Sequence, residues 1–235
     1  MKVLGLDTAT SGCSAALWID GRVTARRAEP MARGQAEALV PMVEAVLADA
    51  GLRFTDLDRI AVTVGPGAFT GVRLAVALAQ GIALALDRPV LPVSTLAVLA
   101  AGAPAAAGDR IVAAIDARMG EVYLGAFDRG GGEPRALMPE RVVGPVDAAL
   151  PEGTGWWGVG TGFDAGEGAL RTRMGAALAG ADAAALPRAG DVARLGALAL
   201  GRGEGLAPER LEPAYLRDNV ALTSREQQAL RDARR

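Results

Sequence analysis

The order of the expected strands and helices repeats once along this chain of 235 residues. Apolar alternation in the first hundred residues predicts three strands in a meander, and then a helix, a strand, a helix, a strand and a short helix. A second series begins at Ile111. Residues 111–116 form an apolar run that ends in an aspartate, as residues 3–7 do, and residues 121–127 alternate as residues 13–19 do. The repeat restricts the chain to two similar α/β units or to one large doubly wound sheet.

The other elements follow from periodicity and turn signals. Asp20-Gly21 is a hairpin turn of the favoured type, Gly51 is a C-cap, and Pro41 predicts a bend or an early boundary in the first helix. The further strands expected are 22–28, 60–64, 90–93 and 156–159, and the helices expected are 35–50, 72–86, a short helix capped by Ser94, and 192–201.

A duplicated meander with flanking helices matches the ribonuclease-H-like fold, doubled as in the actin-like ATPase superfamily. We therefore expect two subdomains, 1–104 and 105–212, joined at the stretch 101–108, which is rich in Ala, Gly and Pro. A C-terminal segment, 213–235, is expected to pack back on the first subdomain and to end flexibly. In this superfamily the aspartates that end the first strand of each unit, here Asp7 and Asp116, face a central cleft.

Histidine is absent, which removes the commonest general base and the commonest zinc ligand. Catalysis by Ser-His or Cys-His pairs and zinc binding through histidine are thereby excluded. The 25 basic and 27 acidic residues give a net charge of −2, so the basic excess of an extended nucleic-acid surface is missing.

Several features indicate a cytoplasmic protein that does not enter a membrane. The N-terminal run lacks the basic region and the cleavage site of a signal peptide. The uncharged stretch 89–108 contains three prolines and many small residues, which argue against a spanning helix. The single cysteine, Cys13, is expected to be a small buried side chain.

A nucleotide cleft is the first chemical hypothesis. Asp7, Thr8 and Ser11 provide the hydroxyl groups and the tight turn that grip phosphate, and Asp116 would hold magnesium together with Asp7. Alternatively, both aspartates only stabilise turns. The residues after Asp116 lack the glycine turn of an active ATPase, and a nuclease needs three or four carboxylates where two align. We expect a vestigial cleft and no cofactor or metal of the chain's own, with ATP or ADP and magnesium only there or at a partner interface.

The loop GPGAFTGVR, residues 65–73, resembles a phosphate-binding turn but has no Lys-Ser or Lys-Thr after its last glycine. We expect a structural entry to the next helix, with Thr70 as its cap and with Arg73 directed outward, toward a carboxylate or toward a partner.

The helix expected at 72–86 is apolar on both sides. Leu74, Leu78, Ile82 and Leu86 form one ridge, and Val72, Val76, Gln80 and Leu84 form another about 200° around, with small residues between. A helix that is apolar all round must be covered all round. Part of that cover is the helix at 35–50, and we expect a partner to supply the rest.

Four motifs identify a resemblance to the TsaB (YeaZ) family: LGLDTATSGCSAAL at 4–17, GPGAFTGVR at 65–73, DARMGEVY at 116–123 and EPAYLRDNVA at 212–221. The resemblance covers almost the whole chain and is looser over 130–186. One departure is Gly34-Gln35, where relatives place a polar pair such as His-Ser, so a polar partner contact there is in doubt.

The resemblance implies a non-catalytic subunit in the synthesis of threonylcarbamoyladenosine at position 37 of tRNA. It implies that the catalytic paralogue TsaD holds the metal through paired histidines, that the ATPase TsaE joins the pair, and that tRNA is bound only through the complex. In this family the first two helices bundle with those of TsaD, or with a second copy when TsaD is absent. The partner-binding residues expected here are Leu39, Val43, Val46, Leu47, Val72, Arg73, Val76, Leu78, Gln80 and Ile82.

Two other functions remain open from the sequence. The first is a small ATPase of the actin-like superfamily that uses Asp7 and Asp116. The second is direct binding of tRNA by the arginine-rich tail, 225–235.

Overall fold

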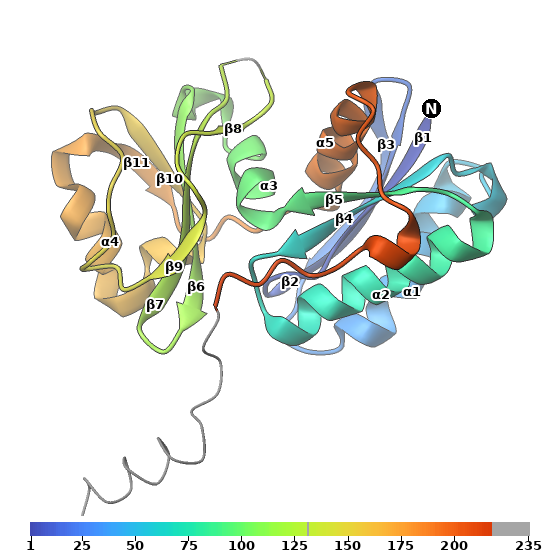
Figure 1. Ribbon diagram of the computed structural model, residues 1–235, viewed down its shortest axis with the longest axis horizontal. Helices are drawn as coiled ribbons and strands as arrows, with labels where there is room; N and C mark the ends of the chain where they lie inside the picture. The colour runs from blue at the N-terminus through green and yellow to red at the C-terminus, as the bar shows by residue number, and fades with distance from the viewer. Residues whose placement is uncertain (131, 218–235) are drawn as a thin grey trace, which may run out of the picture.

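The first sheet consists of the expected meander and two parallel strands. The computed structural model describes residues 1–130 and 132–217, and the sheet order is β3-β2-β1-β4-β5 (Figure 1). Pairing is antiparallel for β1 with β2 and for β2 with β3, and parallel for β1 with β4 and for β4 with β5. The strands are β1 Lys2–Asp7, β2 Gly12–Ile19, β3 Arg22–Pro30, β4 Arg59–Gly65 and β5 Val90–Ser94.

The Asp20-Gly21 hairpin joins β2 and β3 as predicted. Both residues have positive φ angles, 45° and 96°, which suits the right-handed twist of a two-residue hairpin. The central strand β1 is buried from Val3 to Asp7, which explains its unbroken apolar character.

Two helices cover one face of this sheet, α1 Gln35–Asp49 and α2 Phe69–Leu86 (Figure 1). Leu39, Val43 and Val46 of α1 pack into the same core as the strands. The early boundary predicted at Pro41 is wrong, because α1 continues through it. Pro41 is exposed, and the buried face of α1 compensates for the hydrogen bond that the proline cannot donate.

The opposite face of the first sheet is covered by a helix from late in the chain, α5 Ala189–Gly201. The approach is close: a Cβ added to Gly5 would lie 2.2 Å from the carbonyl oxygen of Ala189, and one added to Gly196 would lie 2.5 Å from Cβ of Ala61. The subdomain boundaries expected from the sequence, 1–104 and 105–212, therefore need correction, since α5 completes the core of the first subdomain.

The second sheet repeats the connectivity of the first, in the order β11-β10-β6-β7-β8, and β9 also pairs with β7. Its first two strands are antiparallel, and β10 and β11 are added in parallel. This repetition confirms the duplicated ribonuclease-H-like fold over the single-sheet alternative. The strands are β6 Arg110–Arg118, β7 Glu121–Asp128, β8 Arg135–Ala136, β9 Arg141–Val143, β10 Trp156–Val159 and β11 Leu178–Asp182.

Two helices enclose the second sheet, α3 Thr95–Ala101 and α4 Ala165–Met174. Helix α3 begins at the Ser94 cap that the sequence predicts, where Oγ accepts a hydrogen bond from the amide of Ala97 at 3.2 Å. Leu96 and Leu99 of α3 pack against the second sheet, so α3 lies between the two sheets (Figure 1). Short 3-10 turns occur at Phe54–Asp56, Ala105–Ala107, Thr161–Phe163, Gly175–Ala177 and Pro208–Arg210.

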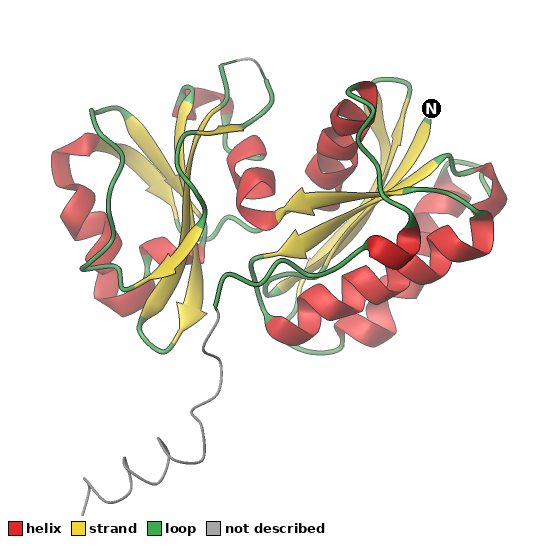
Figure 2. Cartoon of the chain, in the orientation of Figure 1, coloured by secondary structure: helices red, strands yellow, loops and turns green. Residues whose placement is uncertain are grey.

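The segment 206–217, which we call the C-terminal strap, returns along α2 toward the second sheet (Figure 2). Leu211 is buried in the first core, and the amide of Ala214 donates to the carbonyl of Val64 at 2.7 Å. Gln80 of α2 donates to the carbonyls of Pro208 and Leu211 at 3.1 and 3.0 Å. The predicted return to the first subdomain is thus seen as far as Tyr215, and the arginine-rich tail lies outside the described residues.

Candidate interaction face and interdomain cleft

A cleft of about 860 Å³ opens between the two halves of the molecule. Its walls are the turn after β1, the GPGAFTG loop, the end of β6 and the strap. Ser11 and Asp116 line this cleft, as the sequence predicts.

Asp7 and Thr8 do not line the cleft, contrary to the prediction from the sequence. Both are fully buried beneath the turn. The Asp7 Oδ1 atom accepts hydrogen bonds from Thr63 Oγ1 at 2.7 Å and from the amide of Ala9 at 3.3 Å, while Oδ2 has no partner among the described residues. The Thr8 hydroxyl donates to the carbonyl of Gly71 at 2.6 Å. These side chains hold the turn in place.

Burial raises the pKa of Asp7 to about 7, because an ionised carboxylate loses its hydration inside the core; the hydrogen bonds from Thr63 and Ala9 offset this effect only in part. Asp7 is therefore a structural carboxyl group whose charge is disfavoured by its surroundings.

Asp116 is already paired within its own hairpin. Its carboxylate lies 3.1 Å from the Arg118 guanidinium and accepts the amide of Arg118 at 2.8 Å. Among the described residues, no group of three or more Asp, Glu or Cys side chains is arranged to hold a metal ion. With Asp7 turned into the core, the hypothesis of a magnesium site formed by Asp7 and Asp116 does not fit this arrangement.

The glycine-rich loop packs against the turn after β1. A Cβ on Gly67 would lie 2.1 Å from the carbonyl oxygen of Ala9, and one on Gly71 would lie 2.0 Å from that of Thr8. The amide of Ala68 donates to the Ala9 carbonyl at 2.7 Å, so it is not free for a phosphate. The glycines allow two backbone segments to touch.

The cap predicted for the following helix is wrong. Helix α2 begins at Phe69 with Ala68 as its N-cap, and Thr70 lies exposed within the first turn. The Ala68 carbonyl accepts the amide of Val72 at 2.9 Å, so the close packing of the loop starts the helix before Thr70.

Arg73 lies between two aromatic rings and is not paired with a carboxylate in the part of the chain that the structure describes. Its guanidinium carbon lies 3.3 Å from the ring centroid of Phe69 and 5.0 Å from that of Tyr215, which belongs to the strap. Both contacts are of the cation–π type. Arg73 thereby joins the start of α2 to the strap.

Most of the residues predicted to bind a partner face inward. The structure places six of them in the core of the first subdomain: Leu39, Val43, Val46, Leu47, Val72 and Val76. Gln80 binds the strap, while Leu78 and Ile82 are partly buried against the core. The sequence did not indicate which side of each helix the first sheet covers, and partner binding by these two helices stays a prediction.

The exposed side of both helices carries a different apolar set, which we call the outer face. Val40 is 42% exposed and Leu84 is 51% exposed, and small side chains lie beside Leu84 on α2. The outer face consists of Val40, Pro41, Ala77, Gly81, Leu84 and Ala85. These positions lie opposite the sheet-facing residues on each helix. Helical periodicity therefore identifies them once the side that packs on the sheet is known.

Helix α2 is also the one helix within 1–130 and 132–217 that is long and apolar enough to span a membrane, with a mean hydropathy of 1.7. A third of that stretch is buried, and its inner side packs on the first sheet. The absence of a membrane role stays a prediction.

The sequence and the fold of this chain are both similar to those of known proteins. Residues 28–156 match the sequence family described as TsaD, tRNA N6-adenosine threonylcarbamoyltransferase. The chain is 39% identical to the tRNA threonylcarbamoyladenosine biosynthesis protein TsaB of Escherichia coli, across 94% of this chain and 96% of that protein. The protein of the same name from Haemophilus influenzae is 38% identical across 66% and 73%. The solved structure of YeaZ from Pseudomonas aeruginosa superposes with a TM-score of 0.84 at 43% identity, across 92% and 99% of the two chains.

Proposed function

Because the chain belongs to the TsaB (YeaZ) family, whose members are tRNA threonylcarbamoyladenosine biosynthesis proteins, we propose that its part in this synthesis is that of a non-catalytic subunit. It binds a TsaD-type threonylcarbamoyltransferase through the outer face of α1 and α2 and supports that enzyme's activity.

The observation that carries this proposal is the apolar outer face of α2. Leu84 projects into solvent, and apart from the neighbouring backbone of α2 itself no atom of the described residues lies within 4 Å of the position that a Cβ on Gly81 would occupy. A large apolar side chain beside small residues lets a second helix approach closely while burying apolar surface. Such a face suits a partner that presents a helix of the same kind.

A TsaD-type paralogue meets this requirement. The match to the transferase family covers residues 28–156, which include both α1 and α2. Partners that share a fold are able to pair equivalent helices about an approximate twofold axis, as two copies of one chain do. We therefore propose a heterodimer with the transferase and a homodimer when the chain is alone.

The remaining parts of the proposal follow from this role. A TsaE-type ATPase joins the complex, tRNA is engaged through the complex, and the chain acts in the cytoplasm without a membrane. The chain holds no cofactor of its own, and the partner interface is the place proposed for nucleotide and magnesium. The small-ATPase alternative is disfavoured because Asp7 does not reach the cleft and Arg118 pairs with Asp116.

The test is binding of the purified chain to a TsaD-type transferase by calorimetry. Leu84→Glu is expected to weaken binding by about tenfold to a hundredfold, because it places a charge in an apolar interface. Leu137→Glu is the matched control, since Leu137 is 47% exposed and lies in the second subdomain. Charges at Leu78 or Ile82 would be less informative because these side chains also pack on the core. Equal affinity of the Leu84 and Leu137 variants would contradict the proposal.

A further inference from the structure

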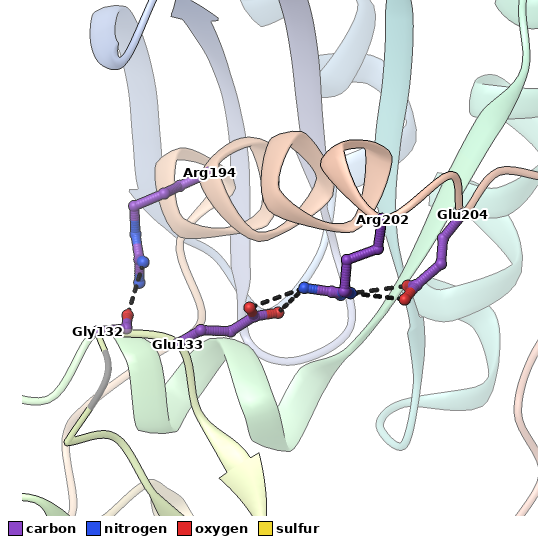
Figure 3. Close-up of polar contacts among 5 residues, drawn as sticks. All are labelled: Gly132, Glu133, Arg194, Arg202 and Glu204. Atoms are coloured by element: carbon purple, nitrogen blue, oxygen red, sulfur yellow. Dashed lines mark hydrogen bonds and ion pairs between the residues drawn. The ribbon is translucent and has the colours of Figure 1, made fainter.

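Helix α5 and the residue after it reach from the first subdomain to the second. Arg194 donates to the carbonyl of Gly132 at 2.9 Å, and Arg202 donates to both carboxylate oxygens of Glu133 at 2.8 Å (Figure 3). Gly132 and Glu133 lie between β7 and β8 of the second sheet, whereas α5 packs on the first. We call these four residues the α5 clasp.

The α5 clasp is oriented by a neighbouring carboxylate in its own subdomain. Glu204 accepts hydrogen bonds from Nε and Nη2 of Arg202 at 2.6 and 3.2 Å. The planar guanidinium thus binds one carboxylate on each of two edges, and the two acids raise its pKa (Figure 3). Glu204 holds the arginine in position within the first subdomain, and of these two acids Glu133 is the one that lies across the junction.

A third arginine, Arg217, joins the subdomains at the end of the strap. Arg217 donates to the Glu121 carboxylate and, at 3.2 Å, to the carbonyl of Ala117, both in the β6–β7 hairpin. The strap itself is fixed to the first subdomain through Gln80 and through the amide of Ala214. We call Arg217, Ala117 and Glu121 the strap clasp.

The two clasps lie at different edges of the junction. Arg217 and Ala117 line the interdomain cleft, whereas no residue of the α5 clasp does. In Figure 1 the α5 clasp belongs to the upper edge, between α5 and β8, and the strap meets the β6–β7 hairpin at the lower edge. A rotation of one subdomain against the other would lengthen at least one set of contacts.

We propose that the α5 clasp and the strap clasp together hold the two subdomains at a fixed angle and so keep the cleft at one opening. Each clasp contains one partly exposed ion pair: the side chains are 46% and 38% exposed for Arg202 and Glu133, and 18% and 38% for Arg217 and Glu121. Pairs of this kind are weak and screened by salt. The clasps therefore act as an ionic device that charge removal or high salt releases.

The test measures the distance between the subdomains in the full-length chain. Spin labels are attached through Glu44→Cys on α1 and Thr172→Cys on α4, both exposed positions, while the native Cys13 is buried and stays unlabelled. Pulsed electron paramagnetic resonance is expected to give a single narrow distance distribution. With Glu133→Gln and Glu121→Gln combined, we expect a second population of molecules at a different distance between the labels. The loss of each ion pair is expected to change the ratio of the second population to the first by up to about fivefold.

The matched control is Asp49→Asn, which removes an ion pair of similar exposure, Arg27–Asp49, that lies within the first subdomain. This control variant is expected to keep the narrow distance distribution. In 1 M salt, the distance distribution of the parent chain is expected to become as broad as that of the double variant. Circular dichroism establishes that each variant is folded. An unchanged distribution in the folded double variant, or equal broadening with Asp49→Asn, would overturn the proposal.

Discussion

Asp7 illustrates at the scale of one residue how surroundings decide chemistry. Its place at the end of β1 is readable from the sequence, and so is its resemblance to an aspartate that faces a cleft. In the structure the carboxyl group points into the core. Thr63 and the amide of Ala9 donate hydrogen bonds to one of its oxygens, and the other oxygen has no hydrogen-bond partner among the described residues. A carboxylate is able to bind a metal ion, but the buried side chain of Asp7 does not reach the cleft where such an ion would lie.

The raised pKa of Asp7 predicts how the stability of the folded state depends on pH. Between the unfolded value of 3.8 and the folded value of about 7, the native state binds more protons than the unfolded chain. Stability therefore falls as pH rises through this window, by an amount on the order of 2–4 kcal/mol. Asp7→Asn removes this contribution, and urea unfolding of both proteins at pH 4.5 and 7.5 measures it.

Comparing the parent chain with the Asp7→Asn variant isolates the contribution of Asp7 to the pH dependence of stability. Burial also raises the pKa values of Glu140 and Asp191, but these groups contribute equally to the parent chain and to the variant. An identical change in stability with pH in both proteins would show that Asp7 does not titrate in this window.

At the scale of elements, α2 carries three different environments around one apolar helix. One side packs on the first sheet, a second holds the strap through Gln80 and Arg73, and a third is the outer face. Its glycines differ in the same way, because Gly71 touches the carbonyl of Thr8 while Gly81 faces open space. The apolar pattern alone does not distinguish these environments.

Alanine at these two glycines is expected to have opposite effects on stability. Gly71→Ala forces a Cβ against a backbone carbonyl and should destabilise the fold by about 2–4 kcal/mol. Gly81→Ala removes a flexible residue from a helix interior without a clash and should stabilise the chain by up to about 1 kcal/mol. Chemical denaturation compares the two, and a Gly71 variant as stable as the parent chain would refute the close packing of this loop.

At the scale of the whole molecule, each subdomain depends on chain segments that are distant in the sequence. Helix α5 returns from beyond the second sheet to cover the first, and α3 leaves the first series to pack on the second sheet. Val3, Ala61 and Leu91 of the first sheet share a core with α5 residues. The first subdomain is therefore incomplete at residue 104.

A fragment of residues 1–104 is expected not to fold as the sequence boundaries suggest. Without α5 it exposes one apolar face of the first sheet, so it should bind the dye ANS and lack a cooperative thermal transition. Joining residues 183–217 to it through a glycine-serine linker should restore cooperative unfolding, followed by circular dichroism. Cooperative melting of 1–104 by itself would contradict the role assigned to α5.

The sequence predicted the fold more completely than it predicted the residues of the cleft and of the outer face. Periodicity located the five strands of the first sheet, the strands β6, β7 and β10 of the second, and the helices α1, α2, α3 and α5, but it missed β8, β9, β11 and α4. The repeat gave the fold class, because alternation and helical spacing are local signals. Thr70 was misassigned as a cap because the contact between the GPGAFTG loop and the β1–β2 turn joins residues about sixty positions apart. The inward side of α1 and α2 was misassigned because both sides of α2 are apolar.

The sequence by itself determined the two repeated units, the absence of histidine chemistry and the presence of a helix too apolar to stand alone. Only the tertiary structure decided that Asp7 is buried, that α5 completes the first subdomain, and that Val40 and Leu84, not Val43 and Val76, face outward. The physical reason is the same in each case. Local pattern fixes which residues are apolar, whereas burial depends on which distant segment covers them, and that is settled when the two sheets and the strap pack together.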